Sequence, residues 1–255
     1  MTYAERLQKR IDDCESCLCV GIDPRPEKHN SIEAIQEFCE QVIEQTEKYA
    51  AAYKPNIAYF EALGVPGYRL IEHLIEKMKE TDVPIILDAK RGDIGTTQEH
   101  YAKGYFENWD VDAVTLSPYM GYDSVEPFLP YEGKGIYLLG VTSNAGADDL
   151  ETHKLASGRM VFELVGDMAE RAEPGSVGLV LGLTNASADV LKRIPDVPLL
   201  IPGLGAQGGD LDSLSGEERK APCVINVSRG ILYAEDEYTF KERAKDYAYR
   251  IADIS

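Results

Sequence analysis

The chain has 255 residues, 44% of them hydrophobic, so it can bury a sizeable core in two small domains or in one α/β barrel. Its formal net charge of −18 argues against nucleic acid and anionic membranes as partners, because the overall field repels both. No apolar run approaches the roughly 18 residues of a membrane-spanning helix, and residues 1–10 lack the apolar core of a signal peptide, so we expect a cytoplasmic protein.

Two predicted helices near the start of the chain carry the pattern of a capping box, in which a polar residue is followed three positions later by Glu. Residues 2–14 begin with Thr2 and Glu5, and residues 30–50 begin with Asn30 and Glu33. In this motif the two side chains bond each other's backbone N–H groups at the helix start. We therefore expect helices that begin at these two positions.

Eight short apolar segments along the chain predict β-strands. Several are nearly continuous in Val, Ile and Leu, as strands buried on both faces are. The segments between them show helical periodicity, for example Val161, Leu164, Val165 and Met168. Eight such repeats predict an α/β fold, a (β/α)₈ barrel that occupies residues 1–255 as one domain. The predicted strands are 17–23, 51–56, 83–90, 111–117, 135–143, 177–183, 198–203 and 223–229.

Three of the five cysteines, Cys14, Cys17 and Cys19, lie close together in the sequence and raise the question of a metal site. A structural zinc site needs four ligands, and the sequence offers no second close pair of Cys or His. We interpret Cys17 and Cys19 as small apolar residues that alternate along a strand. No metal site is expected.

Polar residues follow or end most of the predicted strands. Active sites of (β/α)₈ barrels lie at the carboxyl ends of the strands, so these residues are functional candidates. Each one alone is equally compatible with a solvated loop, but together they concentrate on one rim. They are Asp23, Lys54, Asp88, Lys90, Ser117, Ser143, Gln207 and Arg229.

The segment "LDAKRGDIGTT", residues 87–97, crowds charges at the end of a buried strand. Asp88 and Lys90 are two positions apart, so their side chains share the face that points into the barrel mouth. An acid and a base that are partly buried together keep each other charged. Asp93 and Lys54 can extend this arrangement to a chain of four alternating charges.

A lysine ammonium held among carboxylates can deliver a proton to carbon. A fixed carboxylate also disfavours a second negative group beside it, which suits a reaction that expels CO₂ and protonates the resulting carbanion. Schiff-base chemistry is a rival use of Lys90, but it needs a neutral amine. The other alternative is an ion-pair network that only stabilises the rim.

The loops after the last two predicted strands suggest a phosphate site. Gly203, Gly205 and Gly208 form a literal G-x-G-x-x-G, but the motif follows the seventh strand and no good amphipathic helix comes after it, so the dinucleotide-binding interpretation is weak. Barrels commonly bind phosphate with the loops after strands 7 and 8. Here those loops supply glycine N–H groups together with Gln207 and Arg229.

The D-x-K-x-x-D-I pattern of residues 88–94 resembles the orotidine 5′-phosphate decarboxylase family, in its longer branch. The resemblance covers nearly the whole chain and implies a (β/α)₈ barrel that works as a homodimer on orotidine 5′-phosphate, without metal or organic cofactor. Further motifs in family order are "CVGIDPRP", "YKPNIAYFEALG", "VTSNAGADDL", "PGLGAQGGD" and "SRGILYA".

The resemblance implies roles for residues near the pyrimidine and the ribose. Lys90 would protonate C6 of the pyrimidine as the carboxylate leaves, and Asp88 would lie against that carboxylate. Lys54 would join the charged chain and reach the ribose. Asp23 resembles the ligand of a ribose hydroxyl, and Ser143 is similar in place to the serine that contacts the pyrimidine ring.

The phosphate contacts implied by the resemblance come from the last two loops. Gln207 and Arg229 match the family's phosphate-binding side chains, and Gly208 and Gly230 are the accompanying glycine candidates. One position departs from the shorter branch of the family, which has Gly before the arginine where this chain has Ser228. The resemblance therefore does not identify the backbone N–H group that contacts the phosphate at this point.

Asp93 and Thr97 look like the pair that each subunit contributes to its partner's active site. Two other functions stay open: a Mg²⁺-dependent sugar-phosphate decarboxylase or aldolase of the same barrel superfamily, and a non-catalytic barrel that binds a nucleotide. Ile94, which follows the last aspartate, and the extra length favour the nucleotide enzyme. A non-catalytic barrel should have lost part of the charged chain, and all four members are present.

Overall fold

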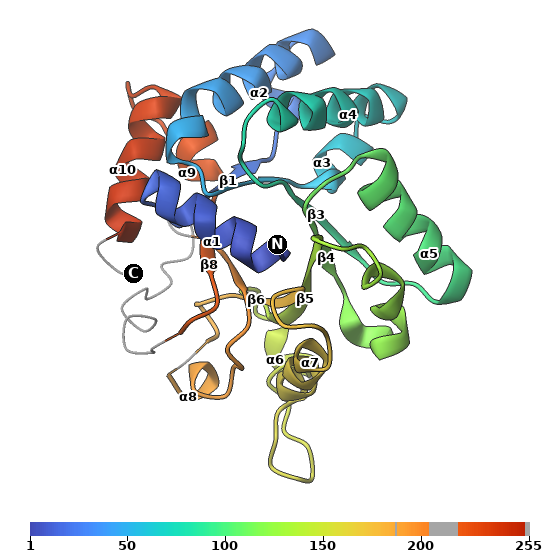
Figure 1. Cartoon of the computed structure of the whole chain (residues 1–255). Helices are drawn as coiled ribbons and strands as arrows, with labels where there is room; N and C mark the ends of the chain where they lie inside the picture. The colour runs from blue at the N-terminus through green and yellow to red at the C-terminus, as the bar shows by residue number, and fades with distance from the viewer. Residues whose placement is uncertain (187, 204–218, 253–255) are drawn as a thin grey trace.

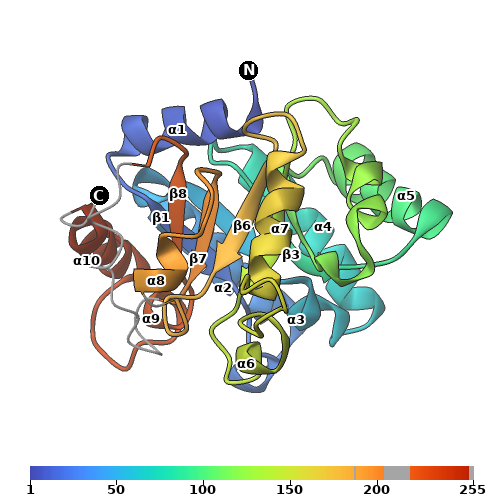
Figure 2. The ribbon, with the colours of Figure 1, turned by 90° about the horizontal axis from the view of Figure 1, so that it is seen from below.

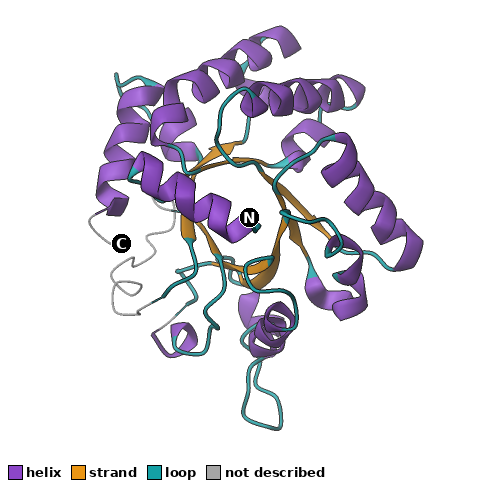
Figure 3. Ribbon diagram, viewed as in Figure 1, coloured by secondary structure: helices purple, strands orange, loops and turns teal. Residues whose placement is uncertain are grey.

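The computed structural model describes residues 1–186, 188–203 and 219–252, and its eight parallel strands form one sheet in the order β2-β1-β8-β7-β6-β5-β4-β3. Isolated bridges from Tyr53 to Ile85 and from Asn56 to Asp88 join the two edge strands. The sheet is therefore a nearly closed barrel, as predicted (Figure 3). The strands are β1 Leu18–Ile22, β2 Ala52–Pro55, β3 Ile86–Arg91, β4 Ala113–Leu116, β5 Gly135–Val141, β6 Val177–Leu181, β7 Leu199–Pro202 and β8 Cys223–Val227.

Helices lie around the ring of strands (Figure 1). Each of the eight predicted strand segments overlaps one observed strand, and seven of them contain it entirely, so the strand prediction is confirmed; β3 extends one residue beyond its segment, to Arg91. Short 3₁₀ turns occupy several loops, and one π-helical turn, Gly104–Asn108, follows α5. The helices are α1 Tyr3–Cys14, α2 Ile32–Thr46, α3 Ile57–Glu61, α4 Val65–Lys79, α5 Gly95–Lys103, α6 Ala147–Leu150, α7 Val161–Glu170, α8 Ala188–Leu191, α9 Arg229–Leu232 and α10 Phe240–Ala252.

The buried apolar side chains divide between the two faces of the sheet. Val20 and Leu138 belong to a large cluster with the surrounding helices. Cys19, Ile86 and Val224 belong to a smaller cluster that fills the barrel interior. This division follows from the alternation of side chains along a strand, and it explains why the strand sequences are apolar at nearly every position.

Helix α1 lies across the amino-terminal end of the barrel, opposite α6 and α9 (Figure 2). The helix begins with the predicted capping box, because Glu5 N–H donates to the Thr2 hydroxyl and Thr2 N–H donates to the Glu5 carboxylate. Leu7 and Tyr3 pack into the interior cluster, and the hydroxyl groups of Tyr3 and Tyr137 lie 3.2 Å apart. The helix thus closes the end of the barrel that is remote from the strands' carboxyl ends.

We expect Leu7→Ala to lower the free energy of unfolding by about 2–5 kcal/mol, because it leaves a cavity where the fully buried Leu7 side chain packs into the interior cluster. Chemical denaturation monitored by circular dichroism measures this change. Leu164→Ala, at a position 38% exposed on α7, is the matched control and should cost much less. An equal loss in the two variants would contradict the assigned role of α1.

The second predicted capping box is wrong. Helix α2 begins at Ile32, and its N-cap is Ser31, whose hydroxyl accepts a hydrogen bond from Ala34 N–H. Because the cap lies one residue later than predicted, Glu33 is the second residue of the helix. A capping box needs Glu at the third residue, so Asn30 and Glu33 do not form one.

The cysteines of the amino-terminal segment are part of the packing. Cys19 is buried within β1, and burial raises the pKa of its thiol to about 12. Cys17 directly precedes the strand and packs partly buried against the large cluster. Among the described residues, no group of three or more His, Cys, Asp or Glu is placed to hold a metal ion, and no helix is long and apolar enough to cross a membrane.

Candidate active site

A cavity of about 460 Å³ lies inside the carboxyl end of the barrel. Its floor includes Leu139, Val180 and Leu200, and its charged wall comes from β2 and β3. An apolar cavity with a few convergent polar groups is typical of a small-molecule site. The remaining lining residues are Lys54, Asp88, Lys90, Thr115, Thr142, Ser143, Asn144, Glu151 and Pro202.

Two lysines converge on the carboxylate of Asp88. Lys54 Nζ lies 2.8 Å from Asp88 Oδ2, and Lys90 Nζ pairs with Asp88 Oδ1. The Lys54 side chain is only 5% exposed, whereas that of Lys90 is 47% exposed. Lys54 is therefore fixed in the wall, and Lys90 is the ammonium that reaches into open space.

The electrostatics keep the buried pair charged. Burial raises the pKa of Asp88, but the charges of Lys54 and Lys90 outweigh burial and hold the pKa well below its usual range. Burial lowers the pKa of Lys54, but the charges of Asp88 and Asp23 outweigh it and raise the pKa above its usual range. The contribution of ionised Asp88 to the free energy of unfolding is lost only as pH falls below about 4. The contribution of charged Lys54 is lost only as pH rises above about 10. Between these limits both groups of the pair stay ionised.

The backbone at Lys90 departs from a regular strand. Lys90 has φ 47, in the left-handed region, and the pairing of β3 with β4 shifts register between Leu87 and Arg91. A bulge of this kind can re-aim a side chain at a functional site. The side chains of Asp88 and Lys90 do meet, as predicted. The prediction assumed a regular strand, in which residues two positions apart share a face, whereas the observed strand is interrupted by a bulge between Leu87 and Arg91.

Thr115 in β4 is a site residue that the sequence reasoning missed. Its hydroxyl donates to Asp88 Oδ1 over 3.0 Å and accepts from Lys90 N–H over 2.9 Å. The residue stands in the apolar run "VDAVTLS", where a β-branched threonine is expected on packing grounds alone. Only its inward-facing position, two residues before the candidate Ser117, distinguishes it.

The loop after β5 is held by its own hydrogen bonds. Glu151 accepts from Thr142 N–H at 2.6 Å and from the Thr142 hydroxyl at 2.8 Å. Asn185 donates to the carbonyl groups of Thr142 and Asn144, at 2.7 and 2.9 Å. These bonds fix the residues on both sides of Ser143, which lines the cavity as expected.

Of the four residues predicted to form a row of alternating charges, Lys54, Asp88 and Lys90 do so within one polypeptide chain. Asp93 accepts a hydrogen bond from Ile94 N–H at 2.8 Å, and among the described residues it forms no ion pair with Lys90. Neither Asp93 nor Thr97 lines the cavity, and Thr97 is exposed on α5. Within its own chain, this pair stands apart from Lys54 and Asp88.

Only some of the residues predicted to bind phosphate lie in the part of the chain that the structure describes. Gln207, Gly205 and Gly208 lie outside the described residues, although Pro202 at the end of β7 lines the cavity. Arg229 begins α9 and is exposed. Gly230 packs closely against Tyr247, because a side chain at this position would collide with the hydroxyl and ring of Tyr247.

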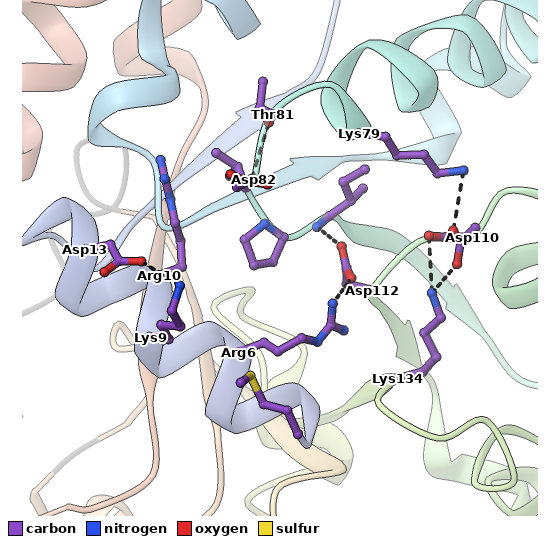
Figure 4. A pocket seen from close by; sticks show the side chains of 14 residues that line it. Arg6, Lys9, Arg10, Asp13, Lys79, Thr81, Asp82, Asp110, Asp112 and Lys134 are labelled. Carbon is purple, nitrogen blue, oxygen red and sulfur yellow. Dashed lines mark hydrogen bonds and ion pairs between the residues drawn. The ribbon is translucent and has the colours of Figure 1, made fainter.

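A larger cavity, of about 710 Å³, opens at the opposite end of the barrel beside α1 (Figure 4). Arg6 lies 2.7 Å from Asp112, and Lys134 lies 2.5 Å from Asp110, to which Lys79 also points. Its cations are largely neutralised by carboxylates of the same wall. We place the active site in the smaller cavity, because only that one combines the strands' carboxyl ends with an unevenly exposed lysine pair.

The fold is a (β/α)₈ barrel, and its inner rim joins two lysines to one buried aspartate. This arrangement is typical of a barrel enzyme that uses ammonium and carboxylate groups in its reaction. Residues 16–243 match the model of the orotidine 5′-phosphate decarboxylase / HUMPS family. The chain belongs to this family, which confirms the resemblance inferred from the sequence motifs.

Individual relatives agree with this assignment over nearly the whole chain. The orotidine 5′-phosphate decarboxylase of Roseiflexus sp. (strain RS-1) is 41% identical over 265 residues, which cover 99% of this chain and 97% of that protein. The structure of Leishmania donovani OMP decarboxylase matches with a TM-score of 0.85 and 38% identity, covering 100% of this chain and 98% of that one. Leishmania donovani UMP synthase matches with a TM-score of 0.89 and 40% identity, and the chain spans 56% of its length.

Proposed function

We propose that the chain decarboxylates orotidine 5′-phosphate to uridine 5′-phosphate, as a carboxy-lyase of pyrimidine biosynthesis in which residues 1–255 act as one catalytic domain. The observation that carries this proposal is the Lys54–Asp88–Lys90 arrangement at the wall of the cavity, in a chain of this family. The Mg²⁺-dependent barrel enzymes and a non-catalytic nucleotide-binding barrel are less well supported, because the relatives that match nearly the full chain carry the decarboxylase name.

In the proposed reaction the bond between C6 and the carboxylate breaks, CO₂ leaves, and the electron pair stays on C6. The Lys90 ammonium then transfers a proton from Nζ to C6. Asp88 and Lys54 hold that ammonium in place, and the fixed charge of Asp88 lies where the substrate carboxylate must approach. Such preorganised charges act most strongly in a site that excludes water.

We assign the candidate residues to three parts of the substrate. Asp23 Oδ1 is buried without a hydrogen-bond partner among the described residues, so we assign it to a ribose hydroxyl. Ser143, which follows β5, lines the same cavity as the two lysines and is assigned to the pyrimidine ring. Arg229, with Gln207, Gly208 and Gly230, is assigned to the phosphate.

We further propose a cytoplasmic homodimer in which Asp93 and Thr97 reach the partner's site. Both residues lie outside the cavity of their own chain. Exposed apolar side chains, Ile94 at 57%, Tyr119 at 79% and Met120 at 50%, follow the adjacent strands β3 and β4 on the same rim. Large apolar side chains that stay exposed after neighbouring strands are typical of an interface with another protein.

The function is tested by following the absorbance of orotidine 5′-phosphate with the purified protein, with and without EDTA. Equal loss of substrate absorbance in both samples supports the proposal. Activity that EDTA removes would instead support a metal-dependent barrel enzyme. Binding of the nucleotide without turnover would support the non-catalytic alternative.

We expect Arg229→Ala to raise KM and also to lower kcat, because phosphate contacts remote from C6 supply binding energy that organises the catalytic charges. The loss of one charge-assisted contact should cost about 1.5–3 kcal/mol of transition-state stabilisation. Steady-state kinetics measure the change. Arg250→Ala, an exposed arginine on α10 with a 3.4 Å partner at Asp246, is the matched control.

Addition of free phosphite to a substrate analogue that lacks the phosphate separates the two effects of this contact. Activation by phosphite in the wild-type protein, and weaker activation in Arg229→Ala, are the expected results. If phosphite activates neither protein, phosphate binding does not contribute to the organisation of the site.

A further inference from the structure

The Thr115 hydroxyl forms hydrogen bonds with both the backbone of Lys90 and the side chain of Asp88. The residue is 1% exposed. Its hydroxyl lies 2.9 Å from Lys90 N and 3.0 Å from Asp88 Oδ1. The same carboxylate oxygen pairs with Lys90 Nζ, so Asp88 Oδ1 contacts both the Thr115 hydroxyl and the Lys90 ammonium.

The direction of both hydrogen bonds is fixed by the chemistry of the partners. The backbone N–H of Lys90 can only donate, so the Thr115 hydroxyl must accept from it. The hydroxyl proton is then available to the carboxylate of Asp88, which can only accept while it is ionised. An apolar side chain at this position would remove the acceptor of the partly buried bond from Lys90 N–H and would also remove one donor from the carboxylate.

The bond to Lys90 N–H also stabilises an unusual backbone conformation. Lys90 has φ 47, and a non-glycine residue in this region persists only when its surroundings enforce it. The register shift between Leu87 and Arg91 takes this part of β3 out of regular pairing with β4. Thr115 supplies an acceptor from β4 at the place where the ladder is interrupted.

We propose that Thr115 is a positioning residue for the decarboxylation, which holds Lys90 and Asp88 in the arrangement that aims the ammonium at the reacting carbon. This inference rests on the proposed function. Thr115 acts through the two charged residues, and its contribution appears in the rate of the chemical step more than in substrate affinity.

Thr46 provides a matched control for the loss of a buried threonine hydroxyl. It is fully buried on α2, and its hydroxyl donates to the Val42 carbonyl over 2.7 Å. Thr46→Val and Thr115→Val therefore make the same chemical change in buried positions. Only the second removes a bond to the site.

The experiment compares kcat and KM for orotidine 5′-phosphate in the wild-type protein, Thr115→Val, Thr115→Ser and Thr46→Val, with thermal unfolding of each. We expect Thr115→Val to lower kcat about 10- to 100-fold, as for the loss of a hydrogen bond to a charged group, with KM changed less than about threefold. Thr115→Ser keeps the hydroxyl and should stay within about threefold of wild type. Thr46→Val should keep wild-type kcat and KM.

Two results would overturn the inference: wild-type kcat in Thr115→Val, or an equal loss of kcat in Thr115→Val and Thr115→Ser. If Thr115→Val does not fold, Thr115→Ala and Thr115→Ser carry the same comparison. Turnover by the wild-type protein and Thr46→Val in the same assay separates this test from that of the proposed function. Without wild-type turnover it is the proposed function that fails.

Discussion

Lys90→Ala is expected to abolish decarboxylation and to leave the protein folded. The side chain is 47% exposed at the cavity, and Asp88 keeps its contacts with Lys54 and Thr115 when Lys90 is removed. A single general acid contributes about 10²–10⁴ to a rate, and here the same group also supplies the proton that completes the product. We therefore expect turnover to fall by at least about 10⁴-fold.

Substrate depletion measured at high enzyme concentration tests this expectation, and circular dichroism checks the fold. Lys134→Ala is the matched control, because its ammonium pairs with Asp110 at the opposite end of the barrel and should not affect turnover. Near wild-type turnover in Lys90→Ala would remove Lys90 from the mechanism. Loss of the folded state would show that the residue supports the barrel itself.

The barrel was predictable from the sequence because its determinants are local. Strands that are buried on both faces must be apolar at nearly every position, and that pattern is visible without knowing what covers them. The cap of α2 was not predicted correctly, because Asn30 and Ser31 are both good N-cap residues and the choice between them depends on how the chain leaves the preceding turn.

The charged centre was predictable in part. Asp88 and Lys90 stand close in the sequence, and the barrel fold brings Lys54 to the neighbouring strand, so their meeting follows from topology. Thr115 was missed because its role depends on a shift in register and on a positive φ at another residue. Neither feature has a signature in the composition of "VDAVTLS".

The hydrogen bonds around Ser143 show the same limit. Glu151 and Asn185 are polar residues in loops, where polar residues are common for many reasons. Their partners at Thr142 and Asn144 are 9 and 41 positions away in the sequence. Pairs of this kind become visible only when the loops are placed in space.

The other large effect concerns Asp93, which lies outside the cavity of its own chain. If Asp93 serves the active site of the partner subunit, Asp93→Ala and Lys90→Ala are each inactive alone but complement each other when mixed. A mixed dimer then has one site that lacks both residues and one site that is intact. Equal amounts of the two chains, reassorted at random, form mixed dimers in half of the cases, so about a quarter of the wild-type activity should return.

The measurement is made after the two proteins are dissociated together and reassociated, with each variant alone and the wild-type protein carried through the same steps. If Asp93 instead acts within its own chain, each site takes both Lys90 and Asp93 from the same chain. Every site in a mixed dimer then lacks one essential residue, because each chain carries one of the two substitutions. Activity at the level of the separate variants would then refute the shared site. Recovery of about a quarter would establish at once that the protein is a dimer, that Asp93 is needed for turnover, and that it acts across the interface, because only a residue supplied by the partner can restore a site that keeps its own Lys90.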